Sequence, residues 1–507
     1  MRRVKDNAPY PQASGPDLSQ LDLRVNAFIW PDYPVVNDPA RPVWHFGPPA
    51  QWMNDPNGTA WHDGWFHVFY QHNPGGDEWG DIHWGHTRSR DLVHWEHLPL
   101  ALRPRHADGE KHCYSGCLAL TATGEPRILY TSVPADSARP ATQVLAIPDD
   151  SDWRAWTQQV GTPFLDLATH GGPAFDFDRK WRDPFVFRAE GRTFLILGAT
   201  LGTEAVIPLY ENPDGGLRHW VYRGIIHRAP RTETPFFECA NLIRFGSKWL
   251  LITSPCREVE WCSGTLDLGA PAFRAGPRGR VDEGDGFYAT QFVRDPAGRT
   301  VLFGWVRNFP KQRGWNGCLA APRRVWLDAA GCLCAEPVAE LAALRSAEKV
   351  FPALSLGPAP TSLDLPGDHL HEVELTLERD PAATVRCEIA GVVIAIGPDG
   401  VRFNDRPPVA HATGEANGLA VARVSRPVNE NHRDKHGSGD PCHIADRVHW
   451  LFDRSMIEIF VGERAVYTRV VPFPSSPVAQ LTASGGYARL LAARAWALRP
   501  APPVMGF

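Results

Sequence analysis

The chain alternates short apolar runs with polar turns over most of its length. From about residue 42 to residue 335, β-type runs are separated by Gly, Pro and Asp turns, with little helical periodicity. Within this stretch one unit recurs five times. A polar head residue opens a short strand, a turn containing Gly follows, and a strongly apolar strand ends about 16 or 17 residues after the head. The heads are Asp55, Ser115, Asp183, Glu238 and Tyr288.

The spacing of the heads predicts the architecture. Successive heads lie about 50 to 70 residues apart, which leaves room for two further strands in each unit. All-β repeats of this period are typical of a β-propeller, here with five blades, and the alternative is an irregular sandwich with chance similarity. If the heads occupy equivalent positions on the innermost strands, Asp55, Asp183 and Glu238 meet at one end of the central channel.

The regions outside the repeat have other patterns. Residues 1–41 are rich in Pro, Asn and Asp and predict an irregular lead-in, and residues 336–350 favour a linker helix. Residues 351–507 return to strand alternation, as in 371–377 and 456–461, without a repeated polar head, which predicts a β-sandwich. Ser425–Asp446 is polar and predicts a loop. Its histidines could suggest a metal, but a solvated loop is the simpler interpretation.

Composition narrows the class of protein. The 507 residues have room for two or more domains, and the net charge of −5 shows no electrostatic footprint for nucleic acid or an anionic membrane. Nineteen Trp beside four Met suit stacking on sugar rings, although Trp buried in β-sheets is the commoner cause. Met1–Gln20 has basic residues but no apolar run, so neither a secretory signal nor a membrane span is expected. The ten scattered Cys then favour reduced thiols in a cytoplasmic protein.

The candidate chemistry centres on Trp52–Gly58. Pro56 favours an extended Asp55, and Asn57-Gly58 favours a tight turn. Taken alone this string is typical of a surface turn, but its place in the repeat puts Asp55 beside two other carboxylates. Carboxylates in a pocket with Trp nearby suggest glycoside hydrolysis, which needs one carboxyl as acid and a second as nucleophile or base.

The surroundings of each carboxylate suggest its role. Asp55 would be the nucleophile. Glu238 would be the acid/base, with its pKa raised by the apolar neighbours Phe236, Phe237 and Cys239. Asp183 follows Arg182, whose charge should keep it ionised and suited to stabilise an oxocarbenium ion.

An ordered set of motifs resembles glycoside hydrolase family 32, the invertase, inulinase and levanase family of β-fructofuranosidases. The likeness runs from about residue 42 to the C-terminus. The matching segments are Trp52–Gly58, Gln71–Pro74, Trp79-Gly80, His83–His86, Ser89–Trp95, Ser115-Gly116, Arg182–Pro184, Glu238-Cys239, Gly286–Ala289, Asp453–Ser455 and Glu458–Phe460.

The resemblance implies roles that agree with those argued from the residues. Asp55 matches the nucleophile, Asp183 the transition-state stabiliser and Glu238 the acid/base of an exo-acting, retaining enzyme. No metal or organic cofactor is expected, and the implied partner is a small carbohydrate such as sucrose, a fructo-oligosaccharide or a fructan. The substrate-binding residues that it implies are Trp52, Asn54, Gln71, Trp79, Ser115, Arg182, Cys239, Tyr288 and Trp305.

Departures from the family pattern leave the substrate open. The family usually has Pro-Asp where this chain has Ala240-Asn241, Tyr where His72 stands, and Ser or Ala where Cys117 stands. The main alternative is a fructosyltransferase with the same intermediate, including one that forms a difructose anhydride. A propeller that only binds carbohydrate would be expected to lose a carboxylate, and a five-bladed glycosidase acting on arabinose or xylose would lack the Trp52–Gly58 motif. Sucrose-6-phosphate is a further possible substrate.

Overall fold

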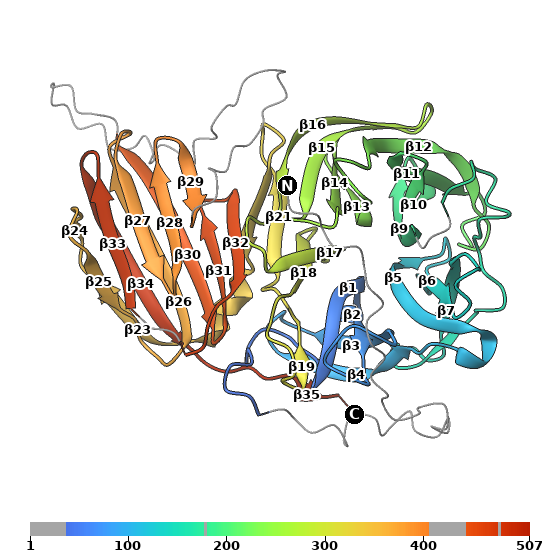
Figure 1. Cartoon of the computed structure of the whole chain (residues 1–507), viewed down its shortest axis with the longest axis horizontal. Helices are drawn as coiled ribbons and strands as arrows, with labels where there is room; N and C mark the ends of the chain where they lie inside the picture. The colour runs from blue at the N-terminus through green and yellow to red at the C-terminus, as the bar shows by residue number, and fades with distance from the viewer. Residues whose placement is uncertain (1–36, 177–179, 405–442, 475–477, 507) are drawn as a thin grey trace.

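The computed structural model describes residues 37–176, 180–404, 443–474 and 478–506. It is an all-β protein in which a five-bladed β-propeller is followed by a β-sandwich (Figure 1). Within the described ranges the helices are two short 3-10 segments, η3 (His106–Asp108) and η4 (Ala339–Leu344). None of the helices in these ranges is long and apolar enough to cross a membrane. The nine cysteines in these ranges are unpaired.

The five blades are consecutive antiparallel sheets. Blade 1 has β1 (Gln51–His62), β2 (Trp65–Asn73), β3 (His83–Ser89) and β4 (Trp95–Leu102). Blade 2 has β5 (Glu110–Leu120), β6 (Pro126–Pro134), β7 (Thr142–Pro148) and β8 (Trp156–Gln158). Blade 3 has β9 (Trp181–Ala189), β10 (Arg192–Leu201), β11 (Glu204–Asn212) and β12 (Val221–Pro230). Blade 4 has β13 (Glu238–Phe245), β14 (Lys248–Ser254), β15 (Glu260–Asp267) and β16 (Ala272–Arg280). Blade 5 has β17 (Phe287–Arg294), β18 (Thr300–Val306), β20 (Cys318–Leu319), β21 (Arg323–Leu327) and β22 (Leu333–Pro337).

The first strand of each blade lines the centre of the ring. These inner strands are β1, β5, β9, β13 and β17; each contacts the next, and β17 contacts β1 again (Figure 1). Two very short strands fasten blade 1 to later parts of the chain. β19 (Trp315–Asn316) pairs in parallel with β1, and β35 (Val504–Met505) pairs in parallel with β4. The end of the chain therefore joins blade 1, whereas the sequence assigned all of 351–507 to the sandwich.

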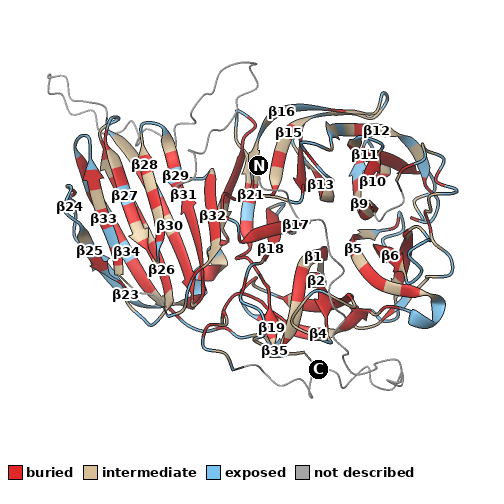
Figure 2. Cartoon of the chain, in the orientation of Figure 1, coloured by how far each residue is buried: buried red, intermediate tan, exposed pale blue. Residues whose placement is uncertain are grey.

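Two sheets pack face to face in the sandwich, and their facing sides hold its apolar core (Figure 2). One sheet is β23 (Arg345–Phe351), β34 (Ala488–Leu498), β26 (Leu370–Arg379), β30 (Ile444–Asp453), β31 (Met456–Val461) and β32 (Ala465–Val470), with β24 (Leu354–Ser355) on β34. The other is β25 (Thr361–Asp364), β33 (Val478–Ser484), β27 (Thr384–Ile389), β28 (Val392–Gly397) and β29 (Gly400–Phe403). In β28 every second side chain is buried, which is the period of a strand with one buried face.

Two predicted boundaries differ from the structure. The linker helix expected over 336–350 is confined to η4, and β23 already begins at Arg345, because Arg345–Phe351 can pair with β34 along the edge of the sandwich. The predicted loop Ser425–Asp446 lies outside the described residues up to 442. Its last residues, from Ile444, form the start of β30, where the Asp446 carboxylate pairs with Arg379 at 2.7 Å.

A buried cluster of charges joins the propeller to the sandwich. Asp453 and Glu458 of the sandwich each contact one ring nitrogen of His45, both at 2.9 Å, and all three side chains are fully buried. Asp453 also accepts the backbone N–H groups of Trp44 and His45, each at 3.0 Å. On the propeller side, Arg323 donates to Glu458 at 2.7 Å. Since both nitrogens of His45 face carboxylates, both must donate, so His45 is an imidazolium.

Candidate active site

The strand pairing is interrupted at the head of every inner strand. A register shift follows the first residues of each pairing, between 53 and 56, 114 and 116, 238 and 241, and 288 and 290; in blade 3 it falls at Gly198, opposite Arg182. The backbone has positive φ at three of these points: 66° at Asp183, 47° at Cys239 and 41° at Ala289. Bulges of this kind re-aim side chains and are common beside active sites. Here they turn the heads toward the centre of the ring.

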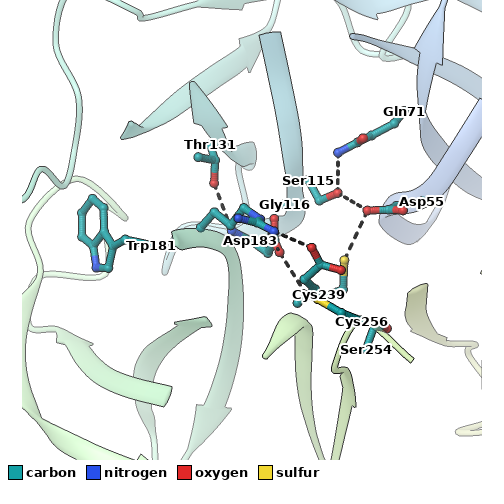
Figure 3. Close-up of polar contacts among 12 residues, drawn as sticks. Asp55, Gln71, Ser115, Gly116, Thr131, Trp181, Asp183, Cys239, Ser254 and Cys256 are labelled. Atoms are coloured by element: carbon teal, nitrogen blue, oxygen red, sulfur yellow. Dashed lines mark hydrogen bonds and ion pairs between the residues drawn. The ribbon is translucent and has the colours of Figure 1, made fainter. Parts of the chain in front are cut away.

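Asp55 receives hydrogen bonds from two other blades. Its Oδ2 accepts the Ser115 hydroxyl at 2.7 Å and the Cys239 thiol at 3.3 Å (Figure 3). Its Oδ1 accepts the Asn54 amide at 3.2 Å. Burial raises the pKa of Asp55, and the nearby Glu238 charge adds to this, while the donors from Ser115, Asn54 and Cys239 oppose it.

A chain of side-chain amides and hydroxyls fixes these donors. The Trp52 indole donates to Asn54 at 2.7 Å, Asn54 donates to Gln71 at 2.6 Å, and Gln71 donates to the Ser115 hydroxyl at 2.6 Å. Because Gln71 uses Ser115 as its acceptor, the single Ser115 proton is directed to Asp55. Figure 3 shows Ser115 between Gln71 and Asp55, with a hydrogen bond to each.

Asp183 lies at the start of β9 and is almost completely enclosed. Its Oδ2 accepts the Cys239 N–H at 3.0 Å, and its own N–H donates to the Thr131 hydroxyl at 3.0 Å (Figure 3). The Arg182 Nε is 3.6 Å from the same carboxylate. Burial raises the pKa of Asp183 to about 7, even though Arg182 and the Cys239 N–H lower it.

Glu238 lies at the start of β13, between a guanidinium and a phenol. Its Oε1 pairs with Arg182, and its Oε2 contacts the Tyr288 hydroxyl. The Tyr288 hydroxyl also reaches the Ser254 carbonyl at 2.9 Å and accepts the Cys256 N–H at 3.1 Å. The Glu238 side chain is 24% exposed, against 6% for Asp183. Of these two carboxyls, Glu238 is thus the more exposed.

Cys239 ties the three carboxylates together. Its thiol donates to Asp55, its N–H donates to Asp183, and it follows Glu238 directly in the chain. Asn241, at the departure from the family pattern, is buried and donates to the carbonyls of Cys239 at 2.6 Å and Thr290 at 3.0 Å. Gly198 allows blades 3 and 4 to approach here, because a Cβ at that position would lie 2.1 Å from the Phe237 carbonyl oxygen.

Aromatic side chains form the rest of the wall. The Trp305 ring meets Trp52 edge-on at 5.4 Å and Tyr288 at 6.4 Å. Trp79 is 43% exposed and lies against His112 and Tyr114, with ring centroids 5.0 and 6.0 Å away. Among the described residues no hydrogen bond joins Trp79 to the three carboxylates, so the structure does not bring this predicted residue into their network.

The structure thus gathers nearly all the predicted site residues into one network. Sequence reasoning missed Thr131, which holds Asp183, and the backbone groups of Ser254 and Cys256, which hold Tyr288. A signal for two of them existed. Tyr114 pairs with Thr131, and Glu238 pairs with Ser254, across the first hairpin of their blades. Thr131 and Ser254 both stand near the ends of apolar second strands, so their positions opposite the start of an inner strand could be predicted from the sequence.

The predicted electrostatics of the site need correction. Arg182 was expected to keep Asp183 ionised, but its guanidinium pairs with Glu238 and stands farther from Asp183, so burial dominates and the pKa of Asp183 rises. The predicted apolar surroundings of Glu238 are also wrong. Phe236 lies under the Arg182 guanidinium at 4.4 Å, and Glu238 itself faces Arg182 and Tyr288.

Comparison with known proteins identifies relatives of this chain. The profile described as "Glycosyl hydrolases family 32 N-terminal domain" matches residues 45–337. The chain is 29% identical over 497 residues to a sucrose-6-phosphate hydrolase of Zymomonas mobilis, covering 91% of this chain and 92% of that protein. It is 32% identical over 371 residues to a cell wall β-fructofuranosidase of Zea mays, covering 66% of this chain and 60% of that protein. The fold matches fructan 1-exohydrolase IIa from Cichorium intybus with a TM-score of 0.74 and 23% identity, covering 92% of this chain and 99% of that one.

Proposed function

Because the chain belongs to glycosyl hydrolase family 32, we propose that it removes terminal β-D-fructofuranosyl residues from sucrose or fructo-oligosaccharides. It is a glycosidase that acts on a carbohydrate, and its relatives include a sucrose-6-phosphate hydrolase and a β-fructofuranosidase. One observation carries the proposal. The carboxylates of Asp55, Asp183 and Glu238 come from three different blades, and Cys239 contacts the first two and directly follows the third.

The proposed reaction retains configuration and has two steps. Asp55 attacks C2 of the fructosyl unit, the bond from C2 to the leaving sugar oxygen breaks, and Glu238 gives that oxygen a proton. Water then attacks C2 and gives a proton to Glu238, and the ester bond to Asp55 breaks. The ionised Asp183, held by the Cys239 N–H, stabilises the positive charge that develops on the sugar ring.

The contacts of Glu238 support it as the carboxyl that faces the leaving group. The Tyr288 hydroxyl donates to one of its carboxyl oxygens, and the Arg182 guanidinium pairs with the other. These two contacts hold the carboxyl in one orientation, and its side chain is 24% exposed against 6% for Asp183.

The proposal is tested by incubation with sucrose while free glucose and free fructose are followed separately. Equal release means that water is the acceptor and supports hydrolysis, whereas glucose in clear excess supports the fructosyltransferase alternative. The matched control is Asp55→Ala. It should lower turnover at least about a thousandfold while the melting temperature shows that the fold is kept. Near-normal turnover in this variant would contradict Asp55 as the nucleophile.

A further inference from the structure

One buried amide connects two of the bulges in the ring. Asn241 is fully buried, and its side-chain nitrogen donates to the Cys239 carbonyl at 2.6 Å and to the Thr290 carbonyl at 3.0 Å. Because both neighbours are carbonyls, which can only accept, the side chain must present its NH2 group to them. Within the described ranges no group donates to the Asn241 Oδ1. The structure therefore uses this amide for its two donors.

The two carbonyls belong to bulges that need support from outside their own strands. The β13–β14 pairing is interrupted just before Asn241, and the β17–β18 pairing just before Thr290. Inside these interruptions the backbone has positive φ, 47° at Cys239 and 41° at Ala289. A residue with a side chain keeps this conformation only where its surroundings hold it. Since Asn241 bonds the backbone of both bulges, it supplies part of that support.

The bulge at Cys239 provides a hydrogen bond that the proposed reaction needs. The Cys239 N–H donates to the Asp183 carboxylate at 3.0 Å. Burial raises the pKa of Asp183 to about 7, and this hydrogen bond opposes the rise. Asn241 fixes the carbonyl on the other side of the Cys239 Cα atom, so it restricts the backbone rotation that would turn the N–H away. Loss of the amide should therefore weaken the bond to Asp183.

Two other amides on the inner strands lack this connection. The Asn57 Oδ1 accepts the Gly116 N–H at 3.3 Å, and the Gln291 side chain donates to the Gly116 carbonyl at 3.2 Å. Both side chains are buried, but in the described part of the chain these bonds go to blade 2 and not to Cys239. Of these three amides, Asn241 is the one that holds the backbone of a residue bonded to Asp183.

We propose that Asn241 is a positioning residue for catalysis, which keeps the Cys239 N–H on the Asp183 carboxylate by fixing the backbone of two adjacent bulges. The inference rests on the proposed function, in which the ionised Asp183 stabilises the positive charge on the sugar ring. Asn241 acts through Cys239 and takes no part in bond breaking. An ionised carboxylate in its place would face the same two carbonyls without a proton to donate.

The test is the pH dependence of kcat/KM for sucrose in Asn241→Leu, which keeps a branched side chain but removes both donors. With a weaker bond from Cys239, Asp183 loses its ionised form at a higher pH. The midpoint of the decline on the acid side should therefore move upward by about 0.5–1 pH unit. Below the midpoint kcat/KM should be about three- to tenfold lower than in wild type, and the difference should be smaller above it. Asn241→Asp, which also adds a negative charge beside the Cys239 bulge, should move the midpoint further.

Asn212→Leu is the matched control. Asn212 is also buried, and its amide donates to the His219 carbonyl at 2.6 Å and to Asp214 at 3.1 Å, on β11 of blade 3. Both Leu variants should have a lower Tm, because each leaves acceptors without their donor, but the acid midpoint of Asn212→Leu should match wild type. A midpoint that stays in place in Asn241→Leu, or that moves equally in both variants, would overturn the inference and leave the proposed function intact.

A milder variant covers the case in which Asn241→Leu does not fold. Asn241→Ser keeps one hydroxyl donor in a smaller volume, so its acid midpoint should move in the same direction by a smaller amount. A folded Asn241→Ser with the wild-type midpoint would contradict the positioning role. If wild type releases no fructose from sucrose at any pH, the proposed function fails, and this inference fails with it.

Discussion

The buried His45 cluster should make a large contribution to stability that an exposed histidine pair does not make. In His45→Phe the ring is kept, but Asp453 and Glu458 each lose a donor in a site with no solvent access. Removing one partner from a buried ion pair costs about 3–5 kcal/mol, because the remaining charge stays buried and uncompensated. For a unit of 150–250 residues this corresponds to a fall in Tm of about 6–20 °C.

The chain contains a matched control. His94 pairs with Asp91 at 2.7 Å, but these side chains are 64% and 45% exposed. An exposed pair of this kind contributes about 0–1 kcal/mol, so His94→Phe should barely change Tm. Calorimetry on both variants measures the difference. Equal Tm values for His45→Phe and His94→Phe would refute the argument that burial makes the His45 contacts strongly stabilising.

The same cluster predicts a pH dependence of stability with a definite sign. Burial alone would lower the pKa of His45, but the hydrogen bonds and charges of Asp453 and Glu458 outweigh it and raise the pKa above 6.5. The stabilisation of the folded state by protonated His45 is therefore complete below about pH 6.5. It is lost as the pH rises through the pKa that His45 has in the folded protein. For Glu458, burial is outweighed by Arg323 and His45, which lower the pKa to about 2, so its contribution is lost as the pH falls from 4.5 toward 2. The difference in Tm between wild type and His45→Phe should be widest between about pH 4.5 and pH 6.5. A difference that grows at alkaline pH would contradict this direction of the pH dependence.

Two further predictions concern the catalytic groups. Glu238→Gln should slow sucrose hydrolysis about 10²–10⁴-fold but slow β-fructofuranosyl fluoride far less, because fluoride leaves without a proton; equal slowing of both would argue against the acid role. Because the pKa of Asp183 is about 7, its ionised form is lost as the pH falls through 7, so kcat/KM should decline on the acid side with a midpoint near there. Asp183→Asn should be much less active and lack this acid limb, and an unchanged limb in that variant would assign the titration to another group.

The repeat could be predicted from sequence because each blade repeats one local pattern. The apolar second strand and the turn before it depend on residues close together in the chain, and the five heads recur at one position in that pattern. The family signatures then implied which role each of the three carboxylate heads has. The very short strands β19 and β35 could not be predicted in this way. Two residues have no periodicity, and their pairing with blade 1 depends on segments hundreds of residues away.

The charges of the site were harder to predict than its members, and the bulges explain why. At a register shift with positive φ, a side chain leaves the direction that its sequence neighbours imply. Asp183 turns at φ 66° toward the Cys239 N–H, while the guanidinium of its neighbour Arg182 crosses to Glu238 on the next blade. Adjacency in the sequence therefore predicted a contact that does form, at 3.6 Å, but it did not predict the pairing of Arg182 with Glu238 or the burial that outweighs the Arg182 charge. The Arg182 charge still lowers the pKa of Asp183, but burial inside the ring outweighs it, so pKa values in such a ring depend on burial and on contacts between blades as well as on the neighbour in the chain.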